Sequence, residues 1–479
     1  MKKLLLVVMV VLVALALCAG VSAVPRHAGA AGAPQAAPAV ATAPIADHCN
    51  FVLAGKLATA DGSVLMGYNN DWATNNFQYL QVVPGDATHY QYVKLLTFGG
   101  VAEGGINVHQ LGVLYGTATT LDKSVLAADP FVKKGNGGEI WDKILQQCST
   151  AKQAIDLLQQ MATTGFTVGA AGSFAIADPN EAWVFELLGG HHWVAARVPD
   201  NSYLAHPNTV LVQQVNLADP ANFRGSADLQ SFAQSIGRYS RADGPFNIAW
   251  AYADRTDLQS YLNTNRMWGV INRWTPSLGC VPAMPFATRP VFVVPSHLLT
   301  RQDFMAICRD HYEGTQLDQT SNYTLMNPNA QTDRPICYST TDYSAVWQLR
   351  GWLPENIGGV MWVATGRPDT SAYVPYYDCV TSVPTAFTGK TAFRSFEGIA
   401  TTLDKGGTIG GTTHYGYNIG LVRSTFGGFE TTCTNAQAST ESTAAGKTGT
   451  AQVTYLTTYS TTCATQALSL ANGLRPQLK

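Results

Sequence analysis

Charged side chains are scarce in this chain of 479 residues. Lys and Arg together number 30, Asp and Glu number 32, and only 13% of the residues are charged, about half of the usual quarter. With a formal net charge of −2, the chain has no basic excess from which a nucleic-acid-binding surface could be built, so no nucleic-acid partner is expected. Uncharged polar residues take the place of charges, which is more typical of an exported protein than of a cytosolic one.

Several short motifs that would identify a known chemistry are also absent. No two cysteines form a CxxC, which excludes a zinc ribbon or a thioredoxin-type motif. There is no HExxH of a zincin and no GxSxG nucleophile elbow. Gly-Lys-Thr occurs at 389–391 and 446–448, but Pro384 and Glu441 stand where the first glycine of a phosphate loop is required. A phosphate loop is therefore excluded as well.

The N-terminus has the pattern of a secretory signal peptide. Lys2 and Lys3 precede an uncharged run from Leu4 to Leu17, and small residues follow up to Ala23. The run is shorter than the ~20 residues of a membrane helix, and no later segment is long and apolar enough for one, so no stable membrane insertion is expected. We expect cleavage after Ala23 and export to a periplasm or out of the cell. A lipoprotein anchored at Cys18 is less favoured, because Leu17 stands where a small residue is needed.

The remaining chain divides by composition. Residues 24–48 are mostly Ala, Pro and Gly and cannot bury enough surface to fold, so they are predicted to be a linker or propeptide. Residues 49–400 have the composition of a globular domain, and residues 401–479 form an extension rich in Thr and Gly. Of the nine cysteines, Cys18 leaves with the signal peptide, and the spacings of the others do not select pairs. The sequence carries no signal for an oligomeric state.

Apolar runs and turn signals predict an α+β fold. Asp61-Gly62 between two short apolar runs predicts a β-hairpin immediately after Cys49. A capping box at Thr150 and another at Thr300 predict the starts of two helices. Strands are expected at 51–57, 63–68, 111–115, 173–177, 182–187, 192–198 and 360–365, and helices at 138–147, from Thr150 onward and at 300–312. Strands and helices come in blocks, which favours α+β layers over alternating βαβ units.

One candidate site is of the penicillin-binding serine type. Ser149 and Lys152 form an SxxK at a helix start, and Lys447 belongs to a Lys-Thr-Gly. In that chemistry a serine at a helix start attacks an amide and the lysine one turn later helps to remove its proton. The third element, a Ser-x-Asn between the two, is not found. A helix cap and a turn explain the same residues.

Cys49 is the other candidate. It stands where the flexible leader meets the folded domain, so cleavage before it would make it the first residue of the mature chain. Its own α-amine, with an ordinary pKa near 7.7–8.0, would then be a base beside the thiol. The predicted hairpin returns the chain to this amine and places Asn69, Asn70 and Asp71 near it. A carboxylate there could hold the amine in position.

Five ordered blocks resemble the bacterial dipeptidases of the cysteine N-terminal-nucleophile (Ntn) hydrolases, which are related to secernins and more distantly to penicillin V acylases and bile salt hydrolases. The block that begins at Arg309 is the most specific of the five. The blocks are 49–71 (CNFVLAGK, ADGS and NND), 104–113 (GGIN and GV), 178–200 (DPNEAW, HWVA and VPD), 309–318 (RDHYEGT and Asp318) and 366–375 (GRPDTS and Pro375).

The resemblance implies a four-layer αββα sandwich that hydrolyses a small peptide, most simply a dipeptide, through an acyl-thioester on a cysteine, with no metal or cofactor. Carried over position by position, it makes Cys49 the nucleophile and Asp71 the carboxylate that orients its amine. It places Asn107 and Asn208 at positions where such enzymes have side-chain amides that contact the substrate or the oxyanion. A further Arg is expected late in the domain, for which we choose Arg266.

The chain departs from the family pattern at Tyr68, where these enzymes often hold an Arg. A catalytically silent binding protein of the same fold is therefore a third hypothesis. Arg273 fits the late arginine as well as Arg266 does. His191-His192 and the block at 309–311 lack a third residue at metal-ligand spacing, so we interpret these histidines as structural. Glu313 and Asp318 are interpreted as loop and helix-end anchors.

Overall fold

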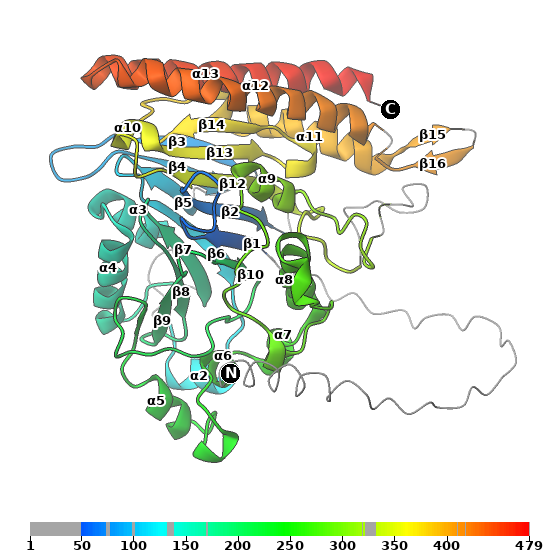
Figure 1. Ribbon diagram of the computed structural model, residues 1–479. Helices are drawn as coiled ribbons and strands as arrows, with labels where there is room; N and C mark the ends of the chain where they lie inside the picture. Colours follow the sequence, from blue (N-terminus) through cyan, green and yellow to red (C-terminus); the bar gives the residue numbers. More distant parts are fainter. Residues whose placement is uncertain are drawn as a thin grey trace, which may run out of the picture. The chain divides into compact units, whose positions relative to one another are not determined.

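The computed structural model describes residues 49–478, apart from 73–76, 98–100, 132–137, 169–170, 319, 321–331, 410 and 417 (Figure 1). The predicted signal peptide, 1–23, and the predicted linker, 24–48, lie outside the described residues. The described residues form one compact unit.

Two antiparallel sheets form the centre of this unit. The strand order of the six-stranded sheet is β10-β1-β2-β12-β13-β14, and that of the eight-stranded sheet is β11-β9-β8-β7-β6-β5-β4-β3. The first sheet consists of β1 (Asn50–Ala54), β2 (Val64–Asp71), β10 (Tyr203–His206), β12 (Thr341–Leu349), β13 (Gly359–Thr365) and β14 (Tyr373–Tyr377). The second consists of β3 (Tyr79–Val83), β4 (Tyr92–Thr97), β5 (Val101–Asn107), β6 (Gly112–Ala118), β7 (Gly172–Ala177), β8 (Ala182–Leu187), β9 (Trp193–Arg197) and β11 (Phe223–Gly225).

Helices flank the two sheets, and a small hairpin of β15 (Gly407–Ile409) and β16 (Thr412–His414) lies outside them. The helices are α2 (Lys123–Ala128), α3 (Gly138–Gln147), α4 (Ala151–Thr164), α5 (Leu229–Ser235), α6 (Ile248–Tyr252), α7 (Arg255–Leu258), α8 (Tyr261–Trp274), α9 (Arg301–Cys308), α10 (Glu355–Gly358), α11 (Lys390–Lys405), α12 (Ile419–Ala445) and α13 (Gly449–Leu474).

The sheets stack face to face with a helical layer on each outer side. Gly116 of β6 lies against the ring of Phe51 in β1, and a Cβ at this glycine would come within 2.2 Å of that ring. Gly112, at the start of the same strand, lies against Met66 of β2 in the same way. Helices α3 and α4 cover the outer face of the eight-stranded sheet, and α9, α11, α12 and α13 cover that of the six-stranded sheet (Figure 1). The predicted αββα sandwich is confirmed.

The predicted hairpin after Cys49 is present. β1 and β2 pair antiparallel with Asn50 opposite Asn69, and Asp61 accepts hydrogen bonds from the backbone and hydroxyl of Ser63 in the connecting turn. The helix predicted after Thr150 is also present, and the Thr150 side chain accepts a hydrogen bond from the backbone N–H of Gln153. These elements follow from local sequence signals alone.

The helix predicted at 300–312 is shorter than expected. It begins at Arg301 with the predicted capping box between Thr300 and Asp303, but it ends at Cys308. The carbonyl of Cys308 accepts a hydrogen bond of 2.8 Å from Asn69 Nδ2 of β2. A side chain of the sheet thus satisfies the last turn of the helix, and the chain leaves it there.

The segment from residue 401 onward is predominantly helical, although its sequence pattern is weak. α11 runs through residue 400, and α12 and α13 pack against β14 of the six-stranded sheet. Thr residues ordinarily disfavour helices, but here their hydroxyls donate to carbonyls four residues earlier, as Thr431 does to Gly427 and Thr458 to Thr454. No helix in the described part of the chain is both long and apolar enough to cross a membrane.

Oxidation is expected to link α12 to α13. The Sγ atoms of Cys433 and Cys463 lie 3.6 Å apart in the buried seam between these helices. Exchange with a small-molecule disulfide should join them, and closing a loop of this size stabilises a protein by about 3–4 kcal/mol. Peptide mapping without reduction should find the Cys433–Cys463 linkage, and reduction should lower the melting temperature. Cys433→Ser should remove both effects, whereas Cys148→Ser should leave both unchanged. An oxidised chain without this linkage would contradict the prediction.

Candidate active site

Cys49 stands immediately before β1, and the hairpin brings the end of β2 to it. The Cys49 Sγ lies 3.8 Å from the backbone carbonyl oxygen of Asp71 and 3.8 Å from Asn70 Nδ2. Asn70 Nδ2 also donates a hydrogen bond of 2.9 Å to the hydroxyl of Tyr68. The structure therefore brings together the cysteine, the aspartate and the asparagine that the sequence places at this end of the hairpin.

The Cys49 thiol is buried and stays protonated at neutral pH. The residue is only 7% exposed, and burial, followed by the negative charge of Asp71, raises the pKa of the thiol to about 12. A hydrogen bond with Tyr68 opposes this rise only in part. At neutral pH the thiol is therefore a poor nucleophile unless a base lies next to it.

The Asp71 carboxylate is held by residues that are far away in the sequence. It forms a fully buried ion pair with Arg334 and accepts a hydrogen bond of 2.5 Å from the hydroxyl of Thr341. The Arg334 guanidinium stacks on the ring of Tyr338, 4.2 Å from its centroid. The Arg334 cation thus faces Asp71 from a distant part of the chain. Tyr68 occupies the position at which the bacterial dipeptidases often hold an Arg.

Arg266 reaches Cys49 from α8. Its guanidinium donates a hydrogen bond of 2.6 Å to the backbone carbonyl of Cys49 and another of 3.1 Å to Asn263 Oδ1. Burial, followed by the nearby charge of Arg334, lowers the pKa of Arg266 to about 9, so it remains charged at neutral pH. The alternative, Arg273, pairs instead with Asp310 at 2.5 Å. The structure therefore brings Arg266, and not Arg273, to Cys49.

Asn208 lies on the other side of Cys49. β10 pairs with β1 with His206 opposite Phe51, so the residues after His206 run beside the start of β1. Asn208 is buried, and its backbone N–H donates a hydrogen bond of 3.2 Å to Asn263 Oδ1, which also binds Arg266. Asn263 thus connects Asn208 and Arg266 at the site.

Asn107 is not part of this arrangement. Its Nδ2 donates to the carbonyls of Leu145 and Cys148, and its Oδ1 accepts from the backbone N–H groups of His109 and Leu111. These four bonds fasten the β5–β6 turn to the end of α3. The turn lies at the end of the sandwich away from Cys49, beyond Gly112. The structure does not bring this amide to the thiol, and we leave Asn107 out of the site.

The serine-type candidate residues lie apart. Ser149 donates a hydrogen bond to Gln153 Oε1 at the exposed start of α4, and the mostly exposed Lys152 pairs with Asp156. Lys447 lies between α12 and α13, on the far side of the other sheet. These groups do not converge on one reaction centre.

Comparison with known proteins identifies the family. The model of "Peptidase family C69" matches residues 83–400. The chain belongs to peptidase family C69. It is 30% identical over 360 residues to a "Probable dipeptidase" of Salmonella dublin, covering 69% of this chain and 80% of the relative. It is 24% identical over 375 residues to "Dipeptidase A" of Lactobacillus helveticus, covering 71% and 77%. The resemblance to bacterial dipeptidases is thus confirmed.

Two solved structures also match this C69 peptidase. Penicillin V acylase from Agrobacterium tumefaciens matches at a TM-score of 0.29 and 11% identity, covering 69% of this chain and 86% of that one. Conjugated bile acid hydrolase from Clostridium perfringens matches at a TM-score of 0.26 and 12% identity, covering 66% and 89%.

Three further residues hold this arrangement and were not predicted from the sequence. Arg334 and Thr341 contact Asp71 across separations of 263 and 270 residues. Asn263 lies one helical turn before Arg266 and binds it on the same helix face. Only Asn263 carried a usable signal, since its spacing from Arg266 follows from helix geometry.

Proposed function

We propose that this C69 peptidase is a dipeptidase whose nucleophile is the Cys49 thiol, exposed as the first residue of the mature chain. The observation that carries the proposal is the convergence of Asp71, Asn70 and Arg266 on Cys49 at the boundary between the leader and the fold. Asp71 and Arg266, two of the residues that the family resemblance assigns to the site, contact Cys49 at the same end of the sandwich.

The α-amine of mature Cys49 would serve as the base. In the full-length chain the Cys49 nitrogen belongs to a peptide bond and cannot accept a proton, so the thiol keeps the raised pKa that burial gives it. Removal of residues 1–48 converts this nitrogen into an amine with an ordinary pKa near 7.7–8.0. The amine and the thiol belong to one residue, so cleavage of the leader activates the nucleophile.

The reaction would proceed in two steps. The amine takes the thiol proton, and the sulfur attacks the peptide carbonyl. The resulting tetrahedral intermediate collapses to an acyl-thioester. The leaving amino group of the substrate takes the proton from the Cys49 ammonium. Water, deprotonated by the Cys49 amine, then attacks the thioester, which releases the acid and restores the thiol. Asp71, held by Arg334 and Thr341, would orient the amine, and Arg266 would fix the Cys49 backbone through its carbonyl.

Asn208 would stabilise the oxyanion, and its replacement tests this role. Asn208→Ala is expected to lower kcat by on the order of 10²–10³ with little change in KM, because a donor aimed at developing charge acts mainly in the transition state. Steady-state kinetics on a dipeptide would measure the loss. Asn201→Ala, in the exposed turn before β10, is the matched control and should retain normal turnover. A normal kcat in Asn208→Ala would remove this residue from the mechanism.

Export and processing are part of the same proposal. Cleavage after Ala23 would release an exported precursor that begins at Val24, in a periplasm or outside the cell, and cleavage before Cys49 would then complete the enzyme. N-terminal sequencing and intact mass of the active protein should give a chain that starts at Cys49, and this chain should hydrolyse dipeptides. A fully active enzyme that still begins at Val24 would contradict the proposed nucleophile.

A further inference from the structure

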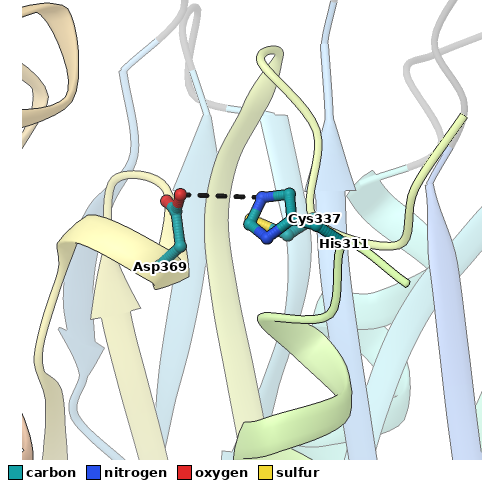
Figure 2. Close-up of side chains that lie close together, drawn as sticks. All are labelled: His311, Cys337 and Asp369. Atoms are coloured by element: carbon teal, nitrogen blue, oxygen red, sulfur yellow. Dashed lines mark ion pairs between the residues drawn. The ribbon is translucent and has the colours of Figure 1, made fainter. Parts of the chain in front are cut away.

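A second cluster of reactive side chains includes Cys337, three residues after Arg334 along the chain. His311 follows α9, Cys337 precedes β12, and Asp369 lies in a short 3-10 helix after β13. One ligand atom from each residue lies within 4.8 Å of the others, and all three residues are buried. Figure 2 shows the Asp369 carboxylate directed at the His311 ring, with the Cys337 sulfur beside that ring. The fold thus supplies the third partner that the sequence spacing of His311 lacked.

We propose that His311, Cys337 and Asp369 bind one first-row divalent metal ion, with Zn²⁺ the best match. An imidazole nitrogen, a thiolate and a carboxylate are the three ligand types that zinc accepts together. Zinc bonds of about 2.0–2.3 Å place tetrahedral ligands roughly 3.3–3.7 Å apart. The present spacing therefore needs only a small inward movement of the side chains. Two anionic ligands would balance the charge of the ion in this buried place.

The residues around the cluster orient it for such a role. Arg367 Nε donates a hydrogen bond of 2.9 Å to Asp369 Oδ1, while Asp369 Oδ2 faces His311 Nε2 at 3.6 Å. The other ring nitrogen of His311, Nδ1, lies 3.4 Å from a Glu313 carboxylate oxygen. A carboxylate beside the second nitrogen favours the tautomer with its proton on Nδ1, which directs the Nε2 lone pair at the cluster. Glu313 therefore has a specific role here beyond that of a loop anchor.

A cavity provides a route for the ion. It has a volume of about 350 Å³, and Asp369 and Glu313 line it together with Asp310, Ser371 and Glu430. Arg309 and Arg423 line the same cavity and pair with Glu430 and Glu313, so two of the four carboxylates of this wall are already balanced by arginines, while Asp369 connects the cavity to the cluster. A fourth ligand, such as a water molecule, could reach the ion from the same side.

The ion would fasten the chain segment that carries Arg334. Cys337 directly follows Ile336, whose carbonyl accepts hydrogen bonds from Asn50 and Asn69 beside the catalytic hairpin. A metal bond to Cys337 would therefore hold the 334–337 segment, and with it the cation facing Asp71. Metal binding itself does not depend on Cys49 being the nucleophile, so the two proposals can fail separately.

Cobalt substitution tests the site in the full-length chain. The Cys49→Ala protein, in which the candidate nucleophile cannot bind metal, is stripped with a chelator and titrated with Co²⁺ and then Zn²⁺. One equivalent of Co²⁺ should give a thiolate-to-metal charge-transfer band that Zn²⁺ abolishes. Adding Cys337→Ser should remove the band and weaken Co²⁺ binding at least about tenfold. Adding His311→Gln should weaken Co²⁺ binding by a similar factor. Zn²⁺ should raise the melting temperature of the parent but not of the Cys337→Ser protein.

Matched cysteine variants separate this site from other thiols. Cys148→Ser removes a buried thiol outside the cluster, and Cys433→Ser disrupts the thiol pair between α12 and α13. Both should keep the band and the affinity. The proposal is overturned if the parent binds no stoichiometric Co²⁺, or if the band persists in the Cys337→Ser protein. The parent titration decides the question even where a variant does not fold.

Discussion

Replacing Cys49 with alanine is expected to leave an exported chain that begins at Val24 and hydrolyses no dipeptide. The substitution removes the thiol that would attack both the leader peptide bond and the substrate. Loss of a nucleophile of this kind costs at least about 10⁴ in kcat. Intact mass and N-terminal sequencing would reveal the uncleaved leader, and a small dipeptide set would measure turnover.

A trimmed form separates chemistry from processing. With a foreign protease site in place of the last leader residues, the Cys49→Ala chain can be cut so that residue 49 carries a free amine. This form should bind a dipeptide but not hydrolyse it, because the base is present without a nucleophile. Dipeptide turnover by the trimmed variant at the wild-type rate would exclude Cys49 as the nucleophile.

Ser149→Ala is the matched control for the rival serine mechanism. The Ser149 hydroxyl bonds only to the side chain of Gln153 at an exposed helix start, and the helix cap itself is Thr150. Its removal should change the free energy of unfolding by no more than about 0.5 kcal/mol and leave turnover intact. Loss of activity in Ser149→Ala together with full activity in Cys49→Ala would favour the serine mechanism over the cysteine one.

The parts of the site that the sequence predicts are those that lie close together along the chain. Asp61-Gly62 determines where the hairpin turns. The register that follows sets Asn50 opposite Asn69 and so brings Asn70 and Asp71 to Cys49. Local capping signals likewise locate the starts of α4 and α9. Such features need only short-range hydrogen bonds and side-chain periodicity, which the sequence displays directly.

The remainder depends on contacts between distant segments. Thr341 reaches Asp71 because β12 pairs with β2, and no local pattern gives the register between two strands so far apart. Asn107 is the converse case. The family block assigns its amide to the site, but in the structure this amide bonds to the β5–β6 turn and to the end of α3. The early end of α9 also depends on a side chain of another element, Asn69.

Asp71→Asn is expected to lower activity sharply and to destabilise the fold at the same time. The substitution leaves the Arg334 guanidinium buried without its counter-charge, and breaking one partner of a buried ion pair costs about 3–5 kcal/mol. It also removes the carboxylate that would orient the Cys49 amine, so kcat/KM should fall by about 10²–10⁴. Denaturant unfolding and dipeptide kinetics on the same preparations would measure both losses.

Removing the second partner distinguishes the two effects. In the Asp71→Asn, Arg334→Gln double variant neither member of this ion pair is left as a buried charge, so much of the lost free energy of unfolding should return. Activity should not return with it, because the carboxylate beside Cys49 is still missing. Arg334→Gln alone should lose stability through the unpaired Asp71, and part of its activity through the loosened carboxylate. If the double variant regains both stability and turnover, Asp71 is only a structural partner of Arg334. Recovery of stability alone identifies Asp71 as the group that positions the amine of the nucleophile.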